Sequence, residues 1–216
     1  VRPVNIGTTR MFKGAIVYSG ASNGMNQLLA QTSFPKINEG TLNNGFYRSA
    51  KKSSPHNLYT SIDAVRAVLE ARGENGPVEL SGFAFAEEAP QAAGALAIHI
   101  PYPKTSTVDY TYDGDQERYL RFVQDEPYVD ELTGAQVATS NVIVVYSEHR
   151  ATDIVEDSLG STSINIVTTG AGRVQIFRDG RVLEGTWRRP DDSYMFEFTD
   201  ADGNVIPLKP GQSWIQ

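Results

Sequence analysis

The chain has 216 residues, of which 40% are hydrophobic, and this is enough apolar material for one large domain or two small ones. Its formal net charge is −7 at pH 7, so the chain as a whole has no basic field that would attract nucleic acid. The absence of cysteine excludes disulfides, thiolate nucleophiles and thiolate metal sites, and no apolar run is long enough to span a membrane.

A strand, a turn and a helix are predicted near the N-terminus. Residues 14–18 form a short apolar run with β-branched residues, and residues 19–24 form a Gly- and Ser-rich turn. Three apolar residues then recur with the spacing of one helix face, namely Met25, Leu28 and Leu29. This pattern predicts a short helix that ends before Pro35.

A second helix is predicted from Ser61 to Arg72. Thr60 and Asp63 have the spacing of a capping box, and apolar residues follow at helical intervals. The helix should stop at the glycine after Arg72, because glycine favours the backbone conformation of a helix end. We interpret residues 1–80 as an α/β domain with two or more helices.

The character of the chain changes after this helix. Residues 73–94 are rich in Gly, Pro, Ala and Glu, and residues 81–94 are interpreted as a linker. From residue 95 to 216, apolar and polar residues alternate with the period of β-strands, and Asp-Gly pairs that supply positive φ in hairpins lie at residues 113–114, 179–180 and 202–203. Residues 95–216 are thus predicted to form a mainly antiparallel β domain, with a long loop at residues 150–162. The fold class is α+β.

The polar stretch from Phe46 to Tyr59 is predicted to be a loop and is the main candidate site. It brings aromatic, cationic, imidazole and amide groups together around a proline, as binding loops often do. The candidate ligand-binding residues are Arg2, Tyr18, Tyr47, Arg48, His56, Asn57 and Tyr59. Arginines of this set could clamp a carboxylate or phosphate, or could form ordinary ion pairs.

Two residues are candidates for catalysis. Ser22 lies in a G-x-S-x-G pattern between a strand and a helix, which is the position of a nucleophile elbow. His56 could act as a general base, since imidazole titrates near neutral pH. The structural alternatives are that Ser22 belongs to a tight turn, or to a helix start whose amides bind an anion, and that His56 fixes the loop through backbone hydrogen bonds while Asn57 caps the next helix. We favour the structural interpretations, because no complete catalytic set accompanies either residue.

Metal and cofactor sites are not predicted. Asp109, Asp113, Asp115 and Glu117 could together hold Ca²⁺, but they lack the pattern of a calcium loop and are better explained as a hairpin turn. Several aromatic residues near the C-terminus could form a sugar-stacking platform or the inner face of the β domain, and we favour the inner face. They are Trp187, Tyr194, Phe196, Phe198 and Trp214.

Short motifs in a fixed order link the chain to a known family. They include Val1-Arg2-Pro3, Tyr47-Arg48, Pro55-His56-Asn57-Leu58-Tyr59, Phe177-Arg178-Asp179-Gly180, Gly185-Thr186-Trp187 and Pro210-Gly211-Gln212-Ser213-Trp214-Ile215. In these motifs the chain resembles the YerB-type lipoproteins, a family of bacterial envelope proteins of unknown function. The resemblance implies an extracytoplasmic protein, either secreted or anchored to the outer face of the cytoplasmic membrane by a lipid outside this chain. It also implies a fragment that lacks the start of its first domain, because family members carry a further segment before the Arg-Pro motif.

Two functions remain open at this point. The leading hypothesis is a non-enzymatic envelope module that binds a wall polymer or another envelope protein through the Tyr/Arg/His loop. The alternative is a hydrolase or transferase that acts on an envelope substrate, using His56 with Ser22 or Arg48. Nucleic acid is not expected as a partner, and contact with the membrane is expected only through an anchor outside the chain.

Overall fold

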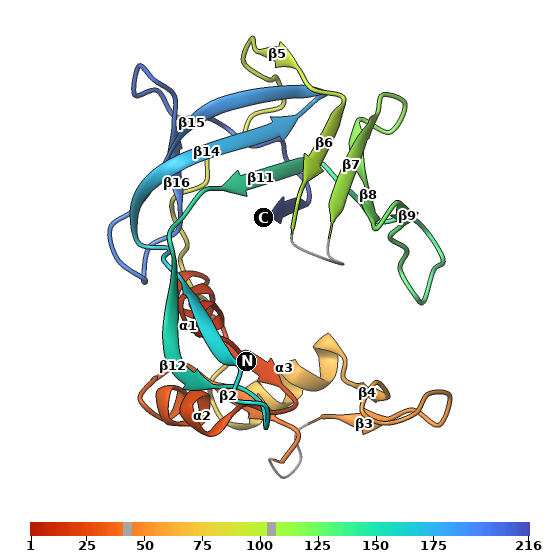
Figure 1. Ribbon diagram of the computed structural model, residues 1–216, viewed down its shortest axis with the longest axis vertical. Helices are drawn as coiled ribbons and strands as arrows, with labels where there is room; N and C mark the ends of the chain where they lie inside the picture. The colour runs from red at the N-terminus through yellow and green to blue at the C-terminus, as the bar shows by residue number, and fades with distance from the viewer. Residues whose placement is uncertain (41–44, 103–106) are drawn as a thin grey trace. The chain divides into compact units, whose positions relative to one another are not determined.

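The computed structural model describes residues 1–40, 45–102 and 107–216, and these form two compact units (Figure 1). Unit 1 comprises Val1–Ser81, Glu148–Thr169 and Pro190–Met195. Unit 2 comprises Gly82–Ser147, Gly170–Arg189 and Phe196–Gln216. The chain therefore leaves unit 1 and returns to it twice. The division of the chain into an N-terminal domain of residues 1–80, a linker of residues 81–94 and a C-terminal domain of residues 95–216 stays a prediction.

The fold class is confirmed as α+β, with strands that are mostly antiparallel. The helices described are α1 (Pro3–Met11), α2 (Asn23–Ala30) and α3 (Ile62–Ala71). None of these helices has the length and apolar character needed to cross a membrane. All three belong to unit 1.

The strands that the structure describes in unit 1 form three small pairs. They are β1 (Ile16–Tyr18) with β2 (Lys36–Asn38), β3 (Tyr47–Arg48) with β4 (Leu58–Tyr59), and β12 (His149–Val155) with β13 (Thr162–Ile166). The first pair is parallel and the other two are antiparallel. The chain passes from β1 through α2 to β2. The finer assignment of residues 1–80 as an α/β domain stays a prediction.

Two of the helices lie where the sequence predicts them. In α2, Met25 and Leu29 are buried, as their spacing indicates. In α3 the N-cap is Ser61, whose hydroxyl accepts a hydrogen bond from the amide of Ala64 at 3.1 Å. The capping box expected at Thr60 is therefore wrong by one residue. The Thr60 hydroxyl instead donates to the carbonyl of Gly45 at 3.0 Å.

Helix α1 and strand β12 carry no clear local signal, whereas β13 lies where the alternation of Ile164 and Ile166 predicts a strand. Only Met11 is buried in α1, so no apolar stripe marks that helix in the sequence. The long loop predicted at residues 150–162 is wrong, since most of it belongs to β12 and to the turn that leads into β13. The pairing register shifts between Ala151 and Val155, which interrupts the alternation by which strands are recognised.

Unit 2 is built from two sheets. Its strands are β5 (Ala93–Gly94), β6 (Ala97–Ile100), β7 (Val108–Asp113), β8 (Arg118–Val123), β9 (Glu126–Pro127), β10 (Ala138–Thr139), β11 (Asn141–Val145), β14 (Gly170–Arg178), β15 (Arg181–Arg189), β16 (Glu197–Thr199) and β17 (Ser213–Ile215). One sheet has the order β10-β8-β7-β6, with β9 beside β8. The other has the order β16-β15-β14-β11-β17, with β5 beside β15. The pairing of β11 with β17 is parallel.

Alternating residues of both sheets form the core of unit 2. The buried members of this cluster are Ile98, Ile100, Val108, Tyr110, Tyr119, Val142 and Phe177. Trp187, Phe196 and Phe198 are also buried and pack ring against ring, as an inner face would. Tyr194, in contrast, is exposed and belongs to unit 1.

The hairpin turns follow the Asp-Gly prediction only in part. Between β14 and β15, Asp179 and Gly180 both adopt positive φ, of 52° and 66°. Between β7 and β8 the prediction is wrong, because Gly114 is not among the positive-φ glycines and Glu117 takes a φ of 51° instead. Asp113 stabilises this turn by accepting hydrogen bonds from the amides of Asp115 and Gln116. Of the acidic residues 109–117, Asp113 is thus occupied in turn formation.

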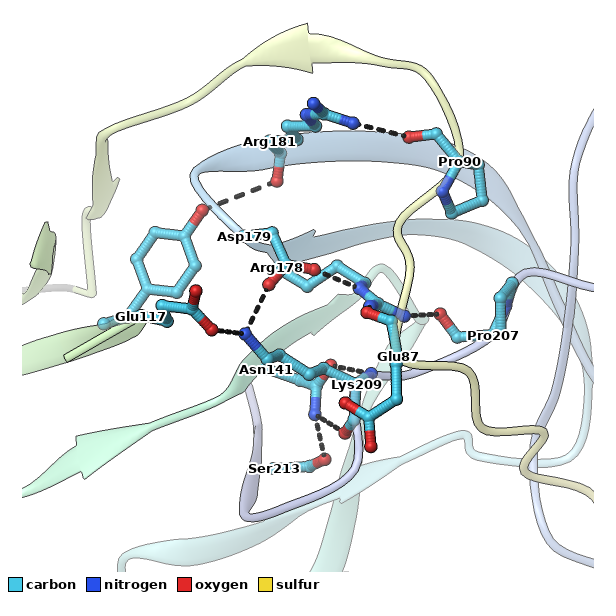
Figure 2. Close-up of polar contacts among 11 residues, drawn as sticks. Glu87, Pro90, Glu117, Asn141, Arg178, Asp179, Arg181, Pro207, Lys209 and Ser213 are labelled. Carbon is cyan, nitrogen blue, oxygen red and sulfur yellow. Dashed lines mark hydrogen bonds and ion pairs between the residues drawn. The ribbon is translucent and has the colours of Figure 1, made fainter. Parts of the chain in front are cut away.

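A buried arginine ties distant segments of unit 2 together (Figure 2). The Arg178 side chain has no exposed surface. Its Nε donates to Asp179 at 2.8 Å, and its two terminal nitrogens donate to the carbonyl oxygens of Pro207 at 3.1 Å and Glu87 at 2.7 Å. One side chain therefore fixes the β14–β15 turn, the segment before β17 and the segment before β5.

Lys209 extends this network to the β7–β8 hairpin (Figure 2). Its ammonium donates to Asp179 at 2.7 Å and to Glu117 at 2.6 Å. Its backbone amide donates to the side chain of Asn141 at 2.7 Å, and the Asn141 amide group returns a hydrogen bond to the Lys209 carbonyl at 2.9 Å. Asp179 therefore lies between two cations.

We expect the Asp179 carboxylate to make the stability of unit 2 depend on pH in the acid range. Burial raises the pKa of Asp179, but hydrogen bonds and charge from Lys209 and Arg178 outweigh burial and lower it below its ordinary value. Because the pKa is lower in the folded chain, the stabilisation is present above the unfolded pKa near 4 and is lost as pH falls through the folded pKa. The urea stabilities of wild type and Asp179→Asn should differ most at neutral pH, and the difference should begin to shrink as the pH falls below about 4.

Tryptophan fluorescence is a suitable probe for this measurement, because Trp187 and Trp214 both belong to unit 2 and the chain has no others. Glu197→Gln, which removes an exposed carboxylate of the same unit, controls for the loss of one negative charge. A difference between wild type and Asp179→Asn that stays constant from pH 7 to pH 3 would contradict the assignment.

Candidate functional site

The predicted polar loop is a β-hairpin whose aromatic side chains stack. Strands β3 and β4 lie side by side (Figure 1), and Tyr47 of β3 pairs with Tyr59 of β4. Their rings lie 5.9 Å apart with an interplanar angle of 23°. The ammonium of Lys52 lies 5.8 Å from the centre of the Tyr59 ring, within reach of a cation–π interaction. Tyr47 is 59% exposed, so one ring of the stack is open to solvent.

Arg48 holds the hairpin in shape. Its guanidinium donates to the side-chain oxygen of Asn57 at 2.7 Å and forms an ion pair with Glu39. The Asn57 amide group in turn donates to the carbonyl of Ser49 at 3.2 Å. Arg48 is therefore in an ion pair, which was the structural alternative to a ligand clamp, and Asn57 bonds within the hairpin instead of capping α3.

His56 lies at the exposed end of the hairpin. Its backbone amide donates to the carbonyl of Ser53 at 3.1 Å, and the Ser54–Pro55 peptide bond before it is cis. Within the described residues, no hydrogen bond to its imidazole is found, so the ring does not fix the loop in the way the structural alternative required. The imidazole is accessible to a ligand.

The other two predicted ligand residues have partners of their own. Arg2 forms an ion pair with Glu156, in the turn after β12. The Tyr18 hydroxyl accepts a hydrogen bond from the side-chain amide of Asn38 at 3.2 Å. The hairpin thus brings together five of the seven predicted residues, whereas Arg2 and Tyr18 are bound to residues outside the hairpin.

Ser22 has a structural role that accounts for its motif. Its hydroxyl oxygen accepts a hydrogen bond from the amide of Met25 at 3.4 Å and so caps α2. Gly24 packs against β12 so closely that an added Cβ would lie 2.9 Å from Cγ2 of Ile154. Helix capping and close packing therefore explain the Ser and the second Gly of the pattern.

Two lysines belong to the hairpin surface although they were not among the predicted site residues. Lys51 and Lys52 are both exposed and lie between β3 and β4. The segment from Phe46 to Thr60 contains these lysines and Arg48 but no acidic residue, in a chain whose net charge is −7. The sequence does carry this signal, as a local reversal of charge.

Comparison with known proteins assigns both parts of the chain to one family. Residues 1–75 match the N-terminal domain, and residues 98–215 the C-terminal domain, of the family described as protein of unknown function (DUF3048). The chain is 27% identical over 212 residues to the "Putative lipoprotein YerB" of Bacillus subtilis. The aligned region covers 94% of this chain and 60% of that relative. It thus spans less than two thirds of the relative's length.

A solved structure agrees with this result. The crystal structure of the YerB protein from Bacillus subtilis superposes with a TM-score of 0.80 at 25% sequence identity, covering 100% of this chain and 71% of that chain. The resemblance inferred from the short motifs is therefore confirmed. The chain belongs to the DUF3048 family of YerB-like proteins, whose function is unknown.

Proposed function

We propose that the protein is a binding module of the bacterial cell envelope that holds an anionic wall polymer through the β3–β4 hairpin. The observation that carries the proposal is the exposed stack of Tyr47 and Tyr59 with Lys52 over one ring. Aromatic faces bind the apolar faces of sugar units, and nearby cations bind phosphate or carboxylate groups. A basic segment in an acidic protein also directs a polyanion to this surface and away from the rest of the molecule.

A relative of this chain supports the envelope location that we propose. The relative from Bacillus subtilis is named as a lipoprotein in its description, and we extend an extracytoplasmic location to this chain. The anchor would be a lipid attached outside the residues of this chain. A wall polymer is then among the macromolecules that the hairpin would meet first.

The test is sedimentation of the protein with purified Bacillus subtilis cell walls. We expect Tyr47→Ala and the double variant Lys51→Ala/Lys52→Ala each to weaken binding by about tenfold, because each removes one kind of contact. Binding should also fall with added salt, since its ionic part is screened. The control is Arg66→Ala, which removes one exposed positive charge from α3 and should bind like the wild type.

Extraction of the anionic polymer from the walls decides between the possible ligands. Loss of binding after extraction supports the proposal. Equal binding to extracted walls would contradict it and would favour another wall component or an envelope protein. Labelling by a serine-directed fluorophosphonate, if it were lost in Ser22→Ala, would instead favour the hydrolase alternative with His56.

A further inference from the structure

Unit 1 has two cavities beside α2 and the β12–β13 pair, of about 420 Å³ and about 760 Å³. Leu28 of α2 and Ile154 of β12 line both, and we refer to the two cavities together as the groove. Helix α1 and strands β12 and β13 line the smaller cavity, and α2 and the end of β12 line the larger one. Both volumes lie in the range of small-molecule sites. No residue of the β3–β4 hairpin lines either cavity.

The larger cavity is lined by three side-chain amides that form no hydrogen bond within the described residues. Asn23 and Gln27 of α2 and Gln31 at its C-cap line this cavity and are exposed. Among the residues that the structure describes, none forms a hydrogen bond with these three side-chain amides. Each amide offers an acceptor oxygen and two donor hydrogens to whatever enters the groove.

The opposite wall contributes a buried carboxylate with one oxygen unpaired. The Glu156 side chain lines the larger cavity and is only 6% exposed. One oxygen is held by Arg2, while Oε1 has no hydrogen-bond partner in the described chain. Leaving a buried acceptor unpaired is unfavourable, so a ligand donor that paired with Oε1 would be bound favourably.

The N-terminal end of α2 also contributes hydrogen-bond donors to the larger cavity. Ser22, Asn23 and Gly24 line the larger cavity, and the first amides of a helix have no partner within it. The close contact of Gly24 with Ile154 keeps this helix end against β12. Donors of the helix start and acceptors after β12 therefore border one cavity.

These walls fit a ligand that both donates and accepts at many points. A hydroxyl group does both, so a sugar can satisfy amides, carboxylates and backbone amides at once. An anion is disfavoured, because Asp153, Glu156 and Asp157 line the same cavity. The apolar residues Leu28 and Ile154 line both cavities and can pack against the C–H face of a sugar ring. We propose that this groove binds a neutral saccharide, at a site separate from the hairpin.

The proposal can be tested by titrating the isotope-labelled 216-residue protein with chitotetraose and with maltotetraose. We expect at least one sugar to cause saturable shifts in NMR signals of residues 22–31 and 153–158. The double variant Gln27→Ala/Gln31→Ala should weaken this binding by about tenfold, since each residue supplies hydrogen bonds to the ligand. Both residues are exposed, so the variant should keep its fold. Gln91→Ala, the same change at an exposed position of unit 2, is the matched control.

Three outcomes would overturn the proposal. The first is the absence of saturable shifts with both sugars at about 20 mM, a concentration that would detect even weak binding. The second is unchanged affinity in the double glutamine variant. The third is an equal response to tetra-alanine, which would mark the groove as a peptide site. Tyr47→Ala should leave sugar binding intact, so failure of the hairpin proposal and failure of the groove proposal are distinguishable.

Discussion

Replacing Arg178 by alanine is expected to destabilise unit 2 by about 3–5 kcal/mol, the usual cost of removing one partner of a buried ion pair. The side chain is fully buried and donates to Asp179 and to the carbonyls of Glu87 and Pro207. Its loss leaves these two carbonyls without that donor and opens a cavity. Urea unfolding followed by tryptophan fluorescence reports the change, since both tryptophans belong to unit 2.

Two further variants make this experiment specific. Arg178→Lys keeps the charge but cannot reproduce the planar set of donors, so its effect should lie between those of wild type and Arg178→Ala. Arg188→Ala removes an exposed arginine from β15 and should change stability by less than about 0.5 kcal/mol. A loss below about 1 kcal/mol in Arg178→Ala would show that the network does not hold the three segments together.

Replacing Gly185 by alanine should cost about 3 kcal/mol, at the upper end of the range for overpacked positions. A Cβ at this position would lie 2.4 Å from the carbonyl oxygen of Thr199 and 2.5 Å from Cδ1 of Ile206. The Thr199 oxygen belongs to β16, which is paired with β15 next to this residue. A backbone atom cannot move aside without disturbing the sheet, so relieving this contact lowers the free energy of unfolding.

The matched control for Gly185 is Gly94→Ala. Gly94 lies in β5, which pairs with the same strand β15, but a Cβ there would meet no atom within 4 Å. Thermal or urea unfolding of the two variants should therefore separate a steric effect from the general effect of adding a methyl group. Equal stabilities of the two variants would contradict the steric explanation.

The hairpin and the groove show how a site can depend on segments far apart in sequence. In the hairpin, Tyr47 and Tyr59 meet because β3 and β4 pair, and Arg48 finds its carboxylate partner at Glu39. In the groove, α2 meets β12 from the returning segment Glu148–Thr169. The first arrangement is local enough for the sequence to indicate it. The second requires the chain to leave unit 1 and come back.

The sequence alone was sufficient where local patterns decide structure. The spacing of Met25 and Leu29 predicted α2, and Asp179-Gly180 predicted a tight turn, because helix faces and positive-φ turns depend on neighbouring residues. The α+β class followed from the same patterns, and the short motifs identified the family. Five of the proposed ligand residues lie on one hairpin for the same local reason.

Only the tertiary structure decided what depends on distant contacts. Helix α1 buries a single residue, and β12 carries a register shift, so neither has a clear period in the sequence. The Glu87 and Pro207 partners of Arg178 and the Glu156 partner of Arg2 also depend on how the chain folds back. Burial of Arg178, the unpaired oxygen of Glu156 and the close contact of Gly24 with Ile154 arise from packing between segments, and no spacing along the chain encodes them.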